Sequence, residues 1–334
     1  MHTTTQQVVQ RWMTERHLPG IAIAVVQHGR VIHARGFGVS DISGRHRVTP
    51  ETPFQIASIT KALTAVGVMR LVETGQLSLD DTVSTHLPAL PAAWRAVTVR
   101  HLLGHTSGIA SISAFDRPPC NAEKAPSDYA RGDVLREVAC LPLEFAPGER
   151  WEYGDTGYYV LGLLLTAMSG RSYEAFMTAQ VFEPAGMRDS RVQQRPPLRG
   201  VAEPVRWRNG AYEPVEPFDP MVDEANGAIV STVLDLARWD AALDANRLVS
   251  AATLTQMWRP VAVRTGDAPY GLGFGLTPFG RHRRVGHTGG GPGSATAFAK
   301  FPDAGLTVIV LARGELPPGT MQRFANEIAA GYLP

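Results

Sequence analysis

A serine and a lysine stand three residues apart in the segment Ser58-Ile59-Thr60-Lys61. Apolar residues recur at helical spacing from there to Gly75, which predicts a helix that begins at Ser58 and carries Lys61 on nearly the same face. The free backbone N–H groups at a helix N-terminus stabilise an oxyanion that forms at an acylated serine. The segment therefore predicts an acyl-enzyme on Ser58 that Lys61 activates, although taken alone it also fits an N-cap serine beside a solvated lysine.

Lysine is rare in this chain, which contains 29 Arg but only three Lys, at positions 61, 124 and 300. A buried Lys can lose its proton and act as a base, whereas Arg stays charged. The retention of Lys61 in a chain that uses Arg almost everywhere favours a chemical role for this amine. The alternative is a surface lysine that was retained without a function.

Two further segments offer groups that such a reaction needs. Tyr153 stands between the turn Pro147-Gly148 and an apolar helix, where its hydroxyl can face a cleft and move protons. Glycines 289, 290, 291 and 293 follow His287, and their small size lets the backbone approach a ligand closely. Seen singly, Tyr153 also fits a core or rim position, and the glycines also fit a hairpin turn.

The order of these motifs along the chain resembles that of the penicillin-recognising serine enzymes: Ser-x-x-Lys, then a Tyr-x-Asn-like triplet at 153–155, then a His-Thr-Gly triplet at 287–289. The pattern is most similar to the class C β-lactamase branch, with its related esterases and D-aminopeptidases. Other segments are similar to that family as well, and together they extend over nearly the whole chain in the family's order: FQIASITK at 54–61, GQLSLDDTVSTHLP at 75–88, LLGHTSGI at 102–109, NGAIVSTVLDLARW at 226–239 and YGLGFG at 270–275.

The resemblance implies a catalytic role for each matching residue. Ser58 would be acylated, Lys61 would activate it, and Tyr153 would pass protons to and from the serine and the leaving group. His287 would replace the family's lysine near the leaving group or a substrate carboxylate. With an ordinary pKa near 6.5, this histidine should make the rate depend on pH between about 5 and 8. The backbone N–H groups of Ser58 and Gly290 would form the oxyanion hole.

By the same resemblance, the substrate is expected to contact Asp155, Thr288 and Gly289. Position 155 departs from the family, which usually has Asn there. Asn can donate to a substrate amide carbonyl, but an ionised Asp can only accept, so recognition of the acylamino group of β-lactams and peptides is in question. A smaller departure is Asn226-Gly227-Ala228, where the family commonly has two adjacent glycines. His105 lies in a segment that we interpret as scaffold.

Composition and charge restrict the partners of the chain. A net charge of +1 over 334 residues gives no electrostatic footprint for nucleic acid or an anionic membrane. The longest apolar run is far shorter than the roughly 20 residues that span a bilayer, and residues 1–7 do not resemble a secretory signal, so a cytoplasmic location is expected. A metal site at His101 and His105 is not expected, because no Glu follows the first histidine as in a metalloprotease motif. The resemblance implies no metal or other cofactor. We interpret Cys120 and Cys140 as thiols.

The expected elements place the motifs between two lobes. Neither chain end has enough strands to stand alone, so one antiparallel sheet built from both ends and covered by the terminal helices is the simplest arrangement. The predicted fold is α+β and β-lactamase/transpeptidase-like, with a sheet lobe of residues 1–60 and 222–334 and an inserted, mostly helical lobe of residues 61–221. The expected elements are helices at 6–17, 131–140, 157–169, 172–182 and 320–332, strands at 21–26, 31–39, 294–301 and 306–313, and a Pro-rich loop at 186–226 with a small hairpin at 206–212.

The function that follows is hydrolysis of a carboxylic ester through acylation and deacylation of Ser58, with a small-molecule ester or amide as the expected partner. A β-lactamase or a D-amino peptidase or amidase is the alternative within the family, and acyl transfer to an alcohol or amine would use the same residues. A covalent penicillin-binding sensor that acylates without turnover is an alternative of another class. The substrate, the oligomeric state and the choice between Lys61 and Tyr153 as the base are left open.

Overall fold

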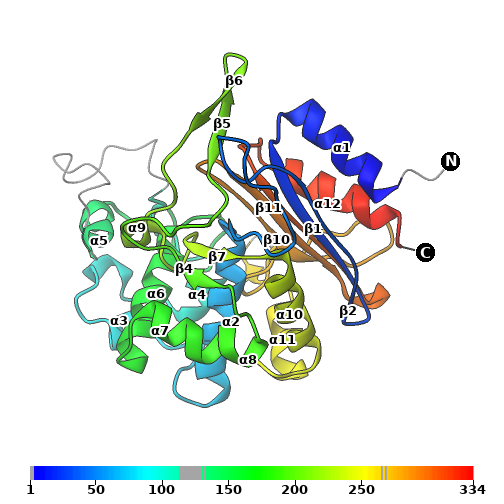
Figure 1. The fold of residues 1–334 in the computed structure, drawn as a ribbon. Helices are drawn as coiled ribbons and strands as arrows, with labels where there is room; N and C mark the ends of the chain where they lie inside the picture. Colours follow the sequence, from blue (N-terminus) through cyan, green and yellow to red (C-terminus); the bar gives the residue numbers. More distant parts are fainter. Residues whose placement is uncertain (1–3, 113–129, 131, 265, 268, 334) are drawn as a thin grey trace.

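A five-stranded antiparallel sheet forms the centre of the molecule, and both ends of the chain contribute to it (Figure 1). The computed structural model describes residues 4–112, 130, 132–264, 266–267 and 269–333. The first strand of the chain pairs with the last one, so the two termini are joined within a single sheet. The strand order is β10 (Val285–Gly291), β11 (Ser294–Phe301), β12 (Leu306–Arg313), β1 (Gly20–Gln27) and β2 (Arg30–Gly38).

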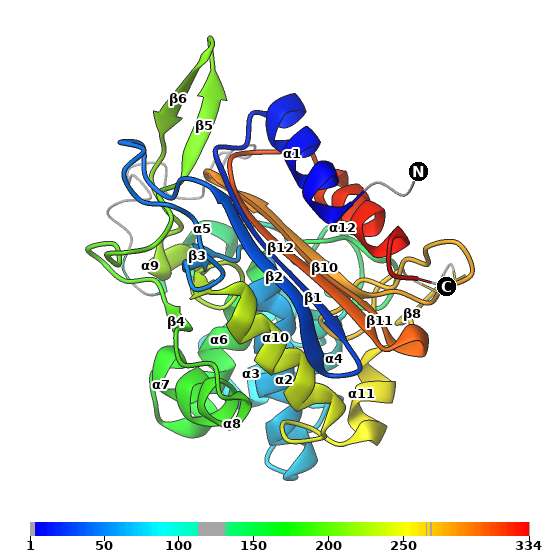
Figure 2. The same ribbon diagram turned by 45° about the vertical axis from the view of Figure 1, so that its right-hand side comes forward.

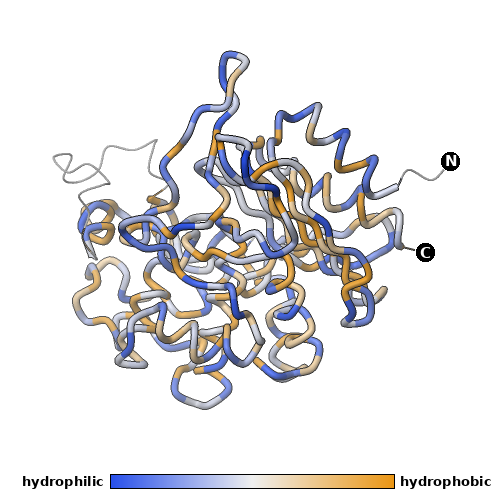
Figure 3. Tube along the Cα trace, in the orientation of Figure 1, coloured by the Kyte–Doolittle hydropathy of each residue, from blue (hydrophilic) through white to orange (hydrophobic). Residues whose placement is uncertain are grey.

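Helices cover both faces of this sheet (Figures 1 and 2). On one face lie α1 (Thr5–Arg16) and α12 (Thr320–Ala330), where Trp12 stacks on Phe324 with ring centroids 4.6 Å apart. The helical lobe covers the opposite face. Because β1 and β12 are buried on both faces, their sequences are almost unbroken apolar runs, which Figure 3 colours mainly orange.

The helix that begins after Ser58 lies at the centre of the helical lobe. This helix, α2 (Ile59–Glu73), is buried along nearly its whole length and packs against α6 (Thr156–Ser169). A helix that is buried all round needs apolar residues on every side, which is why α2 has little amphipathic character. On the sheet side, α10 (Val233–Asp244) is tied to β11 by a buried ion pair in which Lys300 Nζ lies 2.9 Å from Asp240 Oδ1.

Short elements connect these parts, and the segment between residues 186 and 226 contains several of them. A hairpin formed by β5 and β6 projects from the body of the molecule, as Figure 1 shows. The shorter helices and strands are β3 (Phe54–Gln55), α3 (Val83–His86), α4 (Val99–Leu103), α5 (Asp133–Val138), α7 (Tyr173–Met177), α8 (Glu183–Ala185), β4 (Arg191–Val192), β5 (Val205–Arg208), β6 (Ala211–Pro214), α9 (Pro220–Asp223), β7 (Ile229–Ser231), α11 (Ala251–Met257), β8 (Ala262–Val263) and β9 (Gly266–Asp267).

The α+β architecture and the sheet built from both chain ends are confirmed. Strand β10 was not among the predicted strands, because its glycines have a low strand propensity. The lobe boundaries at residues 60 and 222 stay a prediction. Cys140 is disulfide-bonded, so its interpretation as a thiol is wrong, and Cys120 lies outside the described residues. In the described part of the chain, every helix is too short or too polar to cross a bilayer.

Candidate active site

Ser58 lies at a strained turn between β3 and α2. Ala57, immediately before it, has a φ of 48°, in the left-handed region that costs a non-glycine residue roughly 1–2 kcal/mol. The turn is held against the sheet by Thr296, whose Oγ1 donates to the carbonyl oxygen of Ile56 at 2.8 Å. Ser58 is the N-cap of α2, and among the described residues its backbone N–H has no hydrogen-bond partner. The turn therefore presents both the hydroxyl and the free N–H of Ser58.

The Lys61 amine has three acceptors within hydrogen-bonding distance. Its Nζ donates to Ser58 Oγ at 3.1 Å, to Asp155 Oδ1 at 2.7 Å and to the main-chain oxygen of Asn226 at 2.9 Å. An ammonium group carries three protons, so it can donate to these three acceptors at once. The Lys61 side chain is completely buried. This geometry describes a protonated lysine that donates to the serine oxygen.

Asp155 sustains the charge on Lys61. Burial by itself lowers the pKa of the Lys61 amine, but the attraction of the Asp155 carboxylate, with a further contribution from Tyr153, raises that pKa above its usual value. Asp155 stands at the N-cap of α6, and its backbone N–H donates to Ser111 Oγ at 3.0 Å, which orients the residue. The carboxylate remains 29% exposed, so solvent reaches it while the lysine is fully buried.

Tyr153 covers the Lys61 amine, which lies 5.0 Å from the centre of its ring. The residue is 38% exposed overall, while its hydroxyl interacts with Lys61 and Ser58. Burial raises the pKa of this phenol and outweighs the opposite effect of the Lys61 cation, so the neutral phenol is the resting state. His105, expected to be scaffold, packs on Tyr153 at 4.5 Å between ring centroids and accepts a hydrogen bond from the Gly154 N–H through Nδ1. His105 therefore fixes the loop that carries Tyr153.

His287 is uncharged in this site. Its Nδ1 lies 2.6 Å from the carbonyl oxygen of Thr288, which can only accept, so Nδ1 carries the proton. Its Nε2 lies 2.8 Å from the Tyr270 hydroxyl and accepts from it. Burial, together with repulsion by Lys61, lowers the pKa of His287 to about 3. The expectation that this histidine changes its charge between about pH 5 and 8 is therefore wrong.

The backbone of β10 directs the N–H of Gly290 toward the site. Gly275 and Gly286 exchange two backbone hydrogen bonds, of 2.8 and 3.1 Å, across the outer edge of β10. Because the direction of backbone groups alternates along a strand, the N–H groups of residues 288 and 290 point to the same open edge as that of Gly286. In the described part of the chain, nothing accepts a hydrogen bond from the Gly290 N–H.

Gly289 allows β10 to approach the Ser58 turn. A Cβ at position 289 would lie 2.6 Å from the carbonyl oxygen of Ile56 and 2.8 Å from the Cβ of Ala57, closer than packed atoms can come. At Gly290, by contrast, a Cβ would meet no atom within 4 Å. Close packing against the Ser58 turn therefore requires glycine at position 289, whereas position 290 lies at an open surface.

A cavity of about 630 Å³ opens onto Ser58, and we call it the nucleophile cavity. Of the residues expected to act in the site, Lys61 and Asp155 are not part of its wall. An ion pair of Arg206 and Glu315, 2.7 Å apart, forms part of the rim. The wall contains Ser58, Tyr153, His287, Thr288, Gly289 and Gly290, together with the apolar residues Pro292, Leu316, Pro317, Pro318 and Met321.

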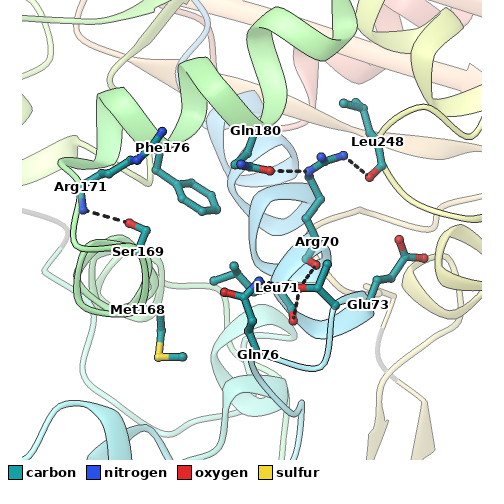
Figure 4. A pocket seen from close by; sticks show the side chains of 11 residues that line it. Arg70, Leu71, Glu73, Gln76, Met168, Ser169, Arg171, Phe176, Gln180 and Leu248 are labelled. Carbon is teal, nitrogen blue, oxygen red and sulfur yellow. Dashed lines mark hydrogen bonds between the residues drawn. The ribbon is translucent and has the colours of Figure 1, made fainter.

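A different cavity, of about 350 Å³, lies at the C-terminal end of α2 (Figure 4). Its polar groups satisfy one another: Arg70 donates to Gln180 Oε1 at 3.2 Å and to the main-chain oxygen of Leu248 at 2.5 Å. Ser169 in its wall donates to Leu165 rather than to a base. The groups that could perform chemistry gather at the other end of the helix, around Ser58.

Sequence reasoning missed three parts of the site. The main-chain oxygen of Asn226 on Lys61 and the hydroxyl of Tyr270 on His287 had no local signal beyond the segments that contain them. Asp223 on α9 is also close, since burial and the repulsion of Asp155 raise its pKa to about 7. Only the folded chain reveals that this carboxyl group from an irregular loop lies near Lys61.

The two histidines considered as a metal pair make unrelated contacts. The Nδ1 of His101 accepts a hydrogen bond from the Thr98 N–H at 3.1 Å, whereas His105 packs against Tyr153. Among the described residues, no group of three or more His, Cys, Asp or Glu side chains is placed to hold a metal ion.

Comparison with known proteins identifies the family of this chain. A family model described as Beta-lactamase matches residues 5–331. Penicillin-binding protein 4* of Bacillus subtilis (strain 168) is 29% identical over 329 residues, which cover 92% of this chain and 71% of that protein. Esterase EstB of Burkholderia gladioli is 30% identical over 301 residues, which cover 80% of this chain and 76% of the esterase.

Solved structures agree with this assignment. The octameric penicillin-binding protein homologue from Pyrococcus abyssi superposes with a TM-score of 0.83 at 31% identity, over 98% of this chain and 76% of that one. D-amino acid amidase from Ochrobactrum anthropi SV3 has a TM-score of 0.85 over 98% of both chains, and at 20% identity it shows a shared fold. The match over nearly the whole chain and the arrangement of Ser58, Lys61 and Tyr153 lead to one conclusion. The chain belongs to the beta-lactamase family of serine hydrolases.

Proposed function

We propose that this protein hydrolyses carboxylic esters through an acyl-enzyme on Ser58. The observation that carries the proposal is the set of three hydrogen bonds of Lys61, which holds a buried cation 3.1 Å from the Ser58 oxygen. A cation at that distance stabilises the serine oxygen as it loses its proton and develops negative charge. The similarity to the Burkholderia esterase supports esters as the substrate class.

The proton leaves Ser58 through Tyr153 in this proposal, because a protonated Lys61 cannot accept it. The Tyr153 oxygen takes the Ser58 proton while its own proton passes to the leaving oxygen of the ester. The bond from Ser58 Oγ to the acyl carbon forms, the ester C–O bond breaks, and the alcohol departs neutral. A neutral phenol suits this relay, since it gives one proton and receives one. Deacylation repeats the relay with water in place of serine and Ser58 Oγ as the leaving oxygen.

The negative charge on the carbonyl oxygen needs donors that are already in place. Ser58 and Gly290 both line the nucleophile cavity, and in this proposal their N–H groups, which have no partner among the described residues, supply these donors. Neutral His287 acts here as a positioning residue, because its two hydrogen bonds hold Tyr270 and the Thr288 carbonyl at the cavity wall. Thr288 and Gly289 contact the substrate as part of the same strand.

The carboxylate at position 155 favours esters over acylated amines. Asp155 accepts from Lys61 and, when ionised, has no proton to offer an amide carbonyl of the substrate. A β-lactam or peptide would bury that carbonyl without a donor, which costs about 1–3 kcal/mol, whereas a simple ester has no such group. Efficient β-lactam turnover is therefore not expected.

A D-amino amide is the second candidate substrate, and one observation favours it. Asp155 uses only Oδ1 for Lys61, and among the described residues its Oδ2 accepts no hydrogen bond, so a substrate ammonium group could pair with it. Acyl transfer would differ only in the acceptor. A sensor that is acylated by penicillin without turnover would show a burst of acylation and no steady release.

The test combines a covalent probe with three substrates. A phosphonate ester should add once to the protein, on Ser58, and Ser58→Ala should lose both the label and the activity. The ratio kcat/KM should be measurable for a short acetate ester and much lower for both a cephalosporin and D-alanine amide. Retained ester hydrolysis in a folded Ser58→Ala variant would refute the acyl-enzyme, and a preference for D-alanine amide would replace the ester by the amide.

A further inference from the structure

A second cavity adjoins the nucleophile cavity, and a buried arginine lines it. This Arg284 cavity has a volume of about 230 Å³ and shares Tyr153, His287 and Thr288 with the nucleophile cavity. Its wall continues along β10 to Arg284, just before the strand begins, and across to Gln322 on α12. The two cavities therefore meet at the residues that surround the leaving group in the proposed reaction.

Arg284 is a buried cation without a carboxylate partner in the described part of the chain. It is 8% exposed, its Nε donates to the carbonyl oxygen of Thr277 at 3.0 Å, and its Nη1 makes a long contact of 3.4 Å with Asn326 Oδ1. Its Nη2 has no hydrogen-bond partner among these residues. Burial lowers the pKa of the Arg284 guanidinium to about 10, which still leaves it charged at neutral pH. Because buried charges are normally paired, this arginine suits the binding of an anionic ligand group.

The other groups around the Arg284 cavity also suit an anion. None of the described residues in its wall is acidic. Trp151 lines it and, within the described residues, has an Nε1–H without a partner. Gln322 and Thr288 add further polar donors. Because His287 is neutral, Arg284 provides the positive charge of this wall.

We propose that the Arg284 cavity is a subsite for a leaving alcohol that ends in a carboxylate. This inference rests on the proposed ester hydrolysis, in which Tyr153 gives its proton to the leaving oxygen. Since Tyr153 and His287 stand at the junction of the two cavities, the leaving alcohol extends past them into the Arg284 cavity, and the acyl group stays in the nucleophile cavity.

The distance from Arg284 to Thr288 along the chain determines how far the carboxylate of the leaving alcohol must lie from the scissile oxygen. Arg284 and Thr288 are four residues apart in nearly extended chain, which corresponds to about 13 Å between their Cα atoms. A carboxylate attached directly beside the scissile oxygen would not reach the guanidinium, whereas one at the end of a short alkyl chain would. The substrates are thus esters of ω-hydroxycarboxylic acids rather than of α-hydroxy acids.

The experiment compares matched esters that differ in one terminal group. We would measure kcat/KM at constant ionic strength for the acetate esters of hydroxybutyrate and hydroxyhexanoate and for the uncharged butyl and hexyl acetates. The wild type should prefer the carboxylate-bearing ester of one length by about ten- to a hundredfold, the range of a charge-assisted hydrogen bond. Arg284→Gln and Arg284→Met should abolish this preference and leave the hydrolysis of the uncharged esters unchanged, and Arg284→Lys should retain part of it.

Controls separate this inference from the proposed function. Arg283 is the matched control, since it is exposed and lies 3.7 Å from Asp303, so Arg283→Met should keep the preference. Binding of free hydroxyhexanoate, measured by calorimetry on wild type and Arg284→Gln, does not depend on catalysis. Binding that needs Arg284 without any ester hydrolysis would support the subsite and refute the esterase. Equal preference in wild type and Arg284→Gln, or no preference in the wild type, would overturn the subsite.

Discussion

The Nζ atom of Lys61 lies 2.7 Å from Oδ1 of Asp155, and the amine is fully buried while the carboxylate is 29% exposed. This pairing decides the protonation state of the lysine, because the carboxylate attraction overcomes the cost of burying the charge. The pairing also places a carboxylate at position 155, where the family usually has an Asn that could donate a hydrogen bond to the substrate. The consequences for activity and for stability can be measured separately.

Replacement of Asp155 by Asn should change selectivity. The variant gains an N–H donor for an amide carbonyl, so kcat/KM for an acylamino cephalosporin should rise about 5- to 150-fold relative to a short ester, which corresponds to about 1–3 kcal/mol. Loss of the counter-ion of a buried lysine should destabilise the fold by about 1–3 kcal/mol, less than for a fully buried pair because Asp155 is partly exposed. An unchanged cephalosporin-to-ester ratio would refute this role, and a selective loss for D-alanine amide would show that Asp155 binds a substrate amine.

The neutral state of His287 predicts that it does not shape the pH profile of the enzyme. Because its pKa is lowered to about 3, the imidazole stays uncharged from about pH 5 to 8. We expect His287→Gln, which retains a donor and an acceptor, to lower the rate without changing the form of the pH–rate profile in that window. Disappearance of an ionisation in the variant would show that His287 titrates there.

Asp223 is the carboxyl group whose titration should appear near neutrality. The pKa of Asp223 is raised from 3.8 to about 7 in the folded protein. At a pH between these two values, the folded protein therefore keeps a proton on Asp223 that the unfolded chain has released. Unfolding then releases a proton, and this group's contribution to stability falls as pH rises from about 4 to 7. Asp223→Asn should therefore match the wild type in Tm at about pH 3.5, where the carboxyl group is largely protonated in both states, and exceed it at about pH 8. An equal difference at both pH values would contradict the raised pKa.

Adjacent glycines in β10 provide a matched pair for testing the approach of the strand to Ser58. Gly289→Ala would press a Cβ against the Ile56 carbonyl and Ala57, so we expect a loss of at least about 1–3 kcal/mol of stability and most of the activity. Gly290→Ala keeps its N–H and adds a methyl group to open space, so stability and kcat for a short ester should stay close to wild type. The comparison needs denaturant titrations and initial rates. Equal tolerance at the two positions would show that β10 is not held tightly against the turn.

Four strands of the sheet, the helix after Ser58 and the family could all be predicted from the sequence, because local residue patterns specify them. The alternation and apolar runs of the terminal segments predict β1, β2, β11 and β12 as strands, and helical periodicity after Ser58 predicts α2. The three motifs in their order identify the family. Rarity alone does not mark a lysine as catalytic in this chain, since Lys300 is also buried and paired, with a role in packing α10 onto the sheet.

Tertiary structure alone decided the charges of the site. A pKa depends on burial and on neighbours that are distant in the sequence, so a cationic Lys61 and a neutral His287 required the positions of Asp155, Asn226 and Tyr270. The sequence predicted that His287 titrates near neutral pH, because the residue type specifies only the ordinary pKa of the side chain and not its surroundings. The same reason applies to Arg284: its side chain is one arginine among 29 in the sequence, and only the packing of β10 and α12 buries it with no carboxylate partner among the described residues.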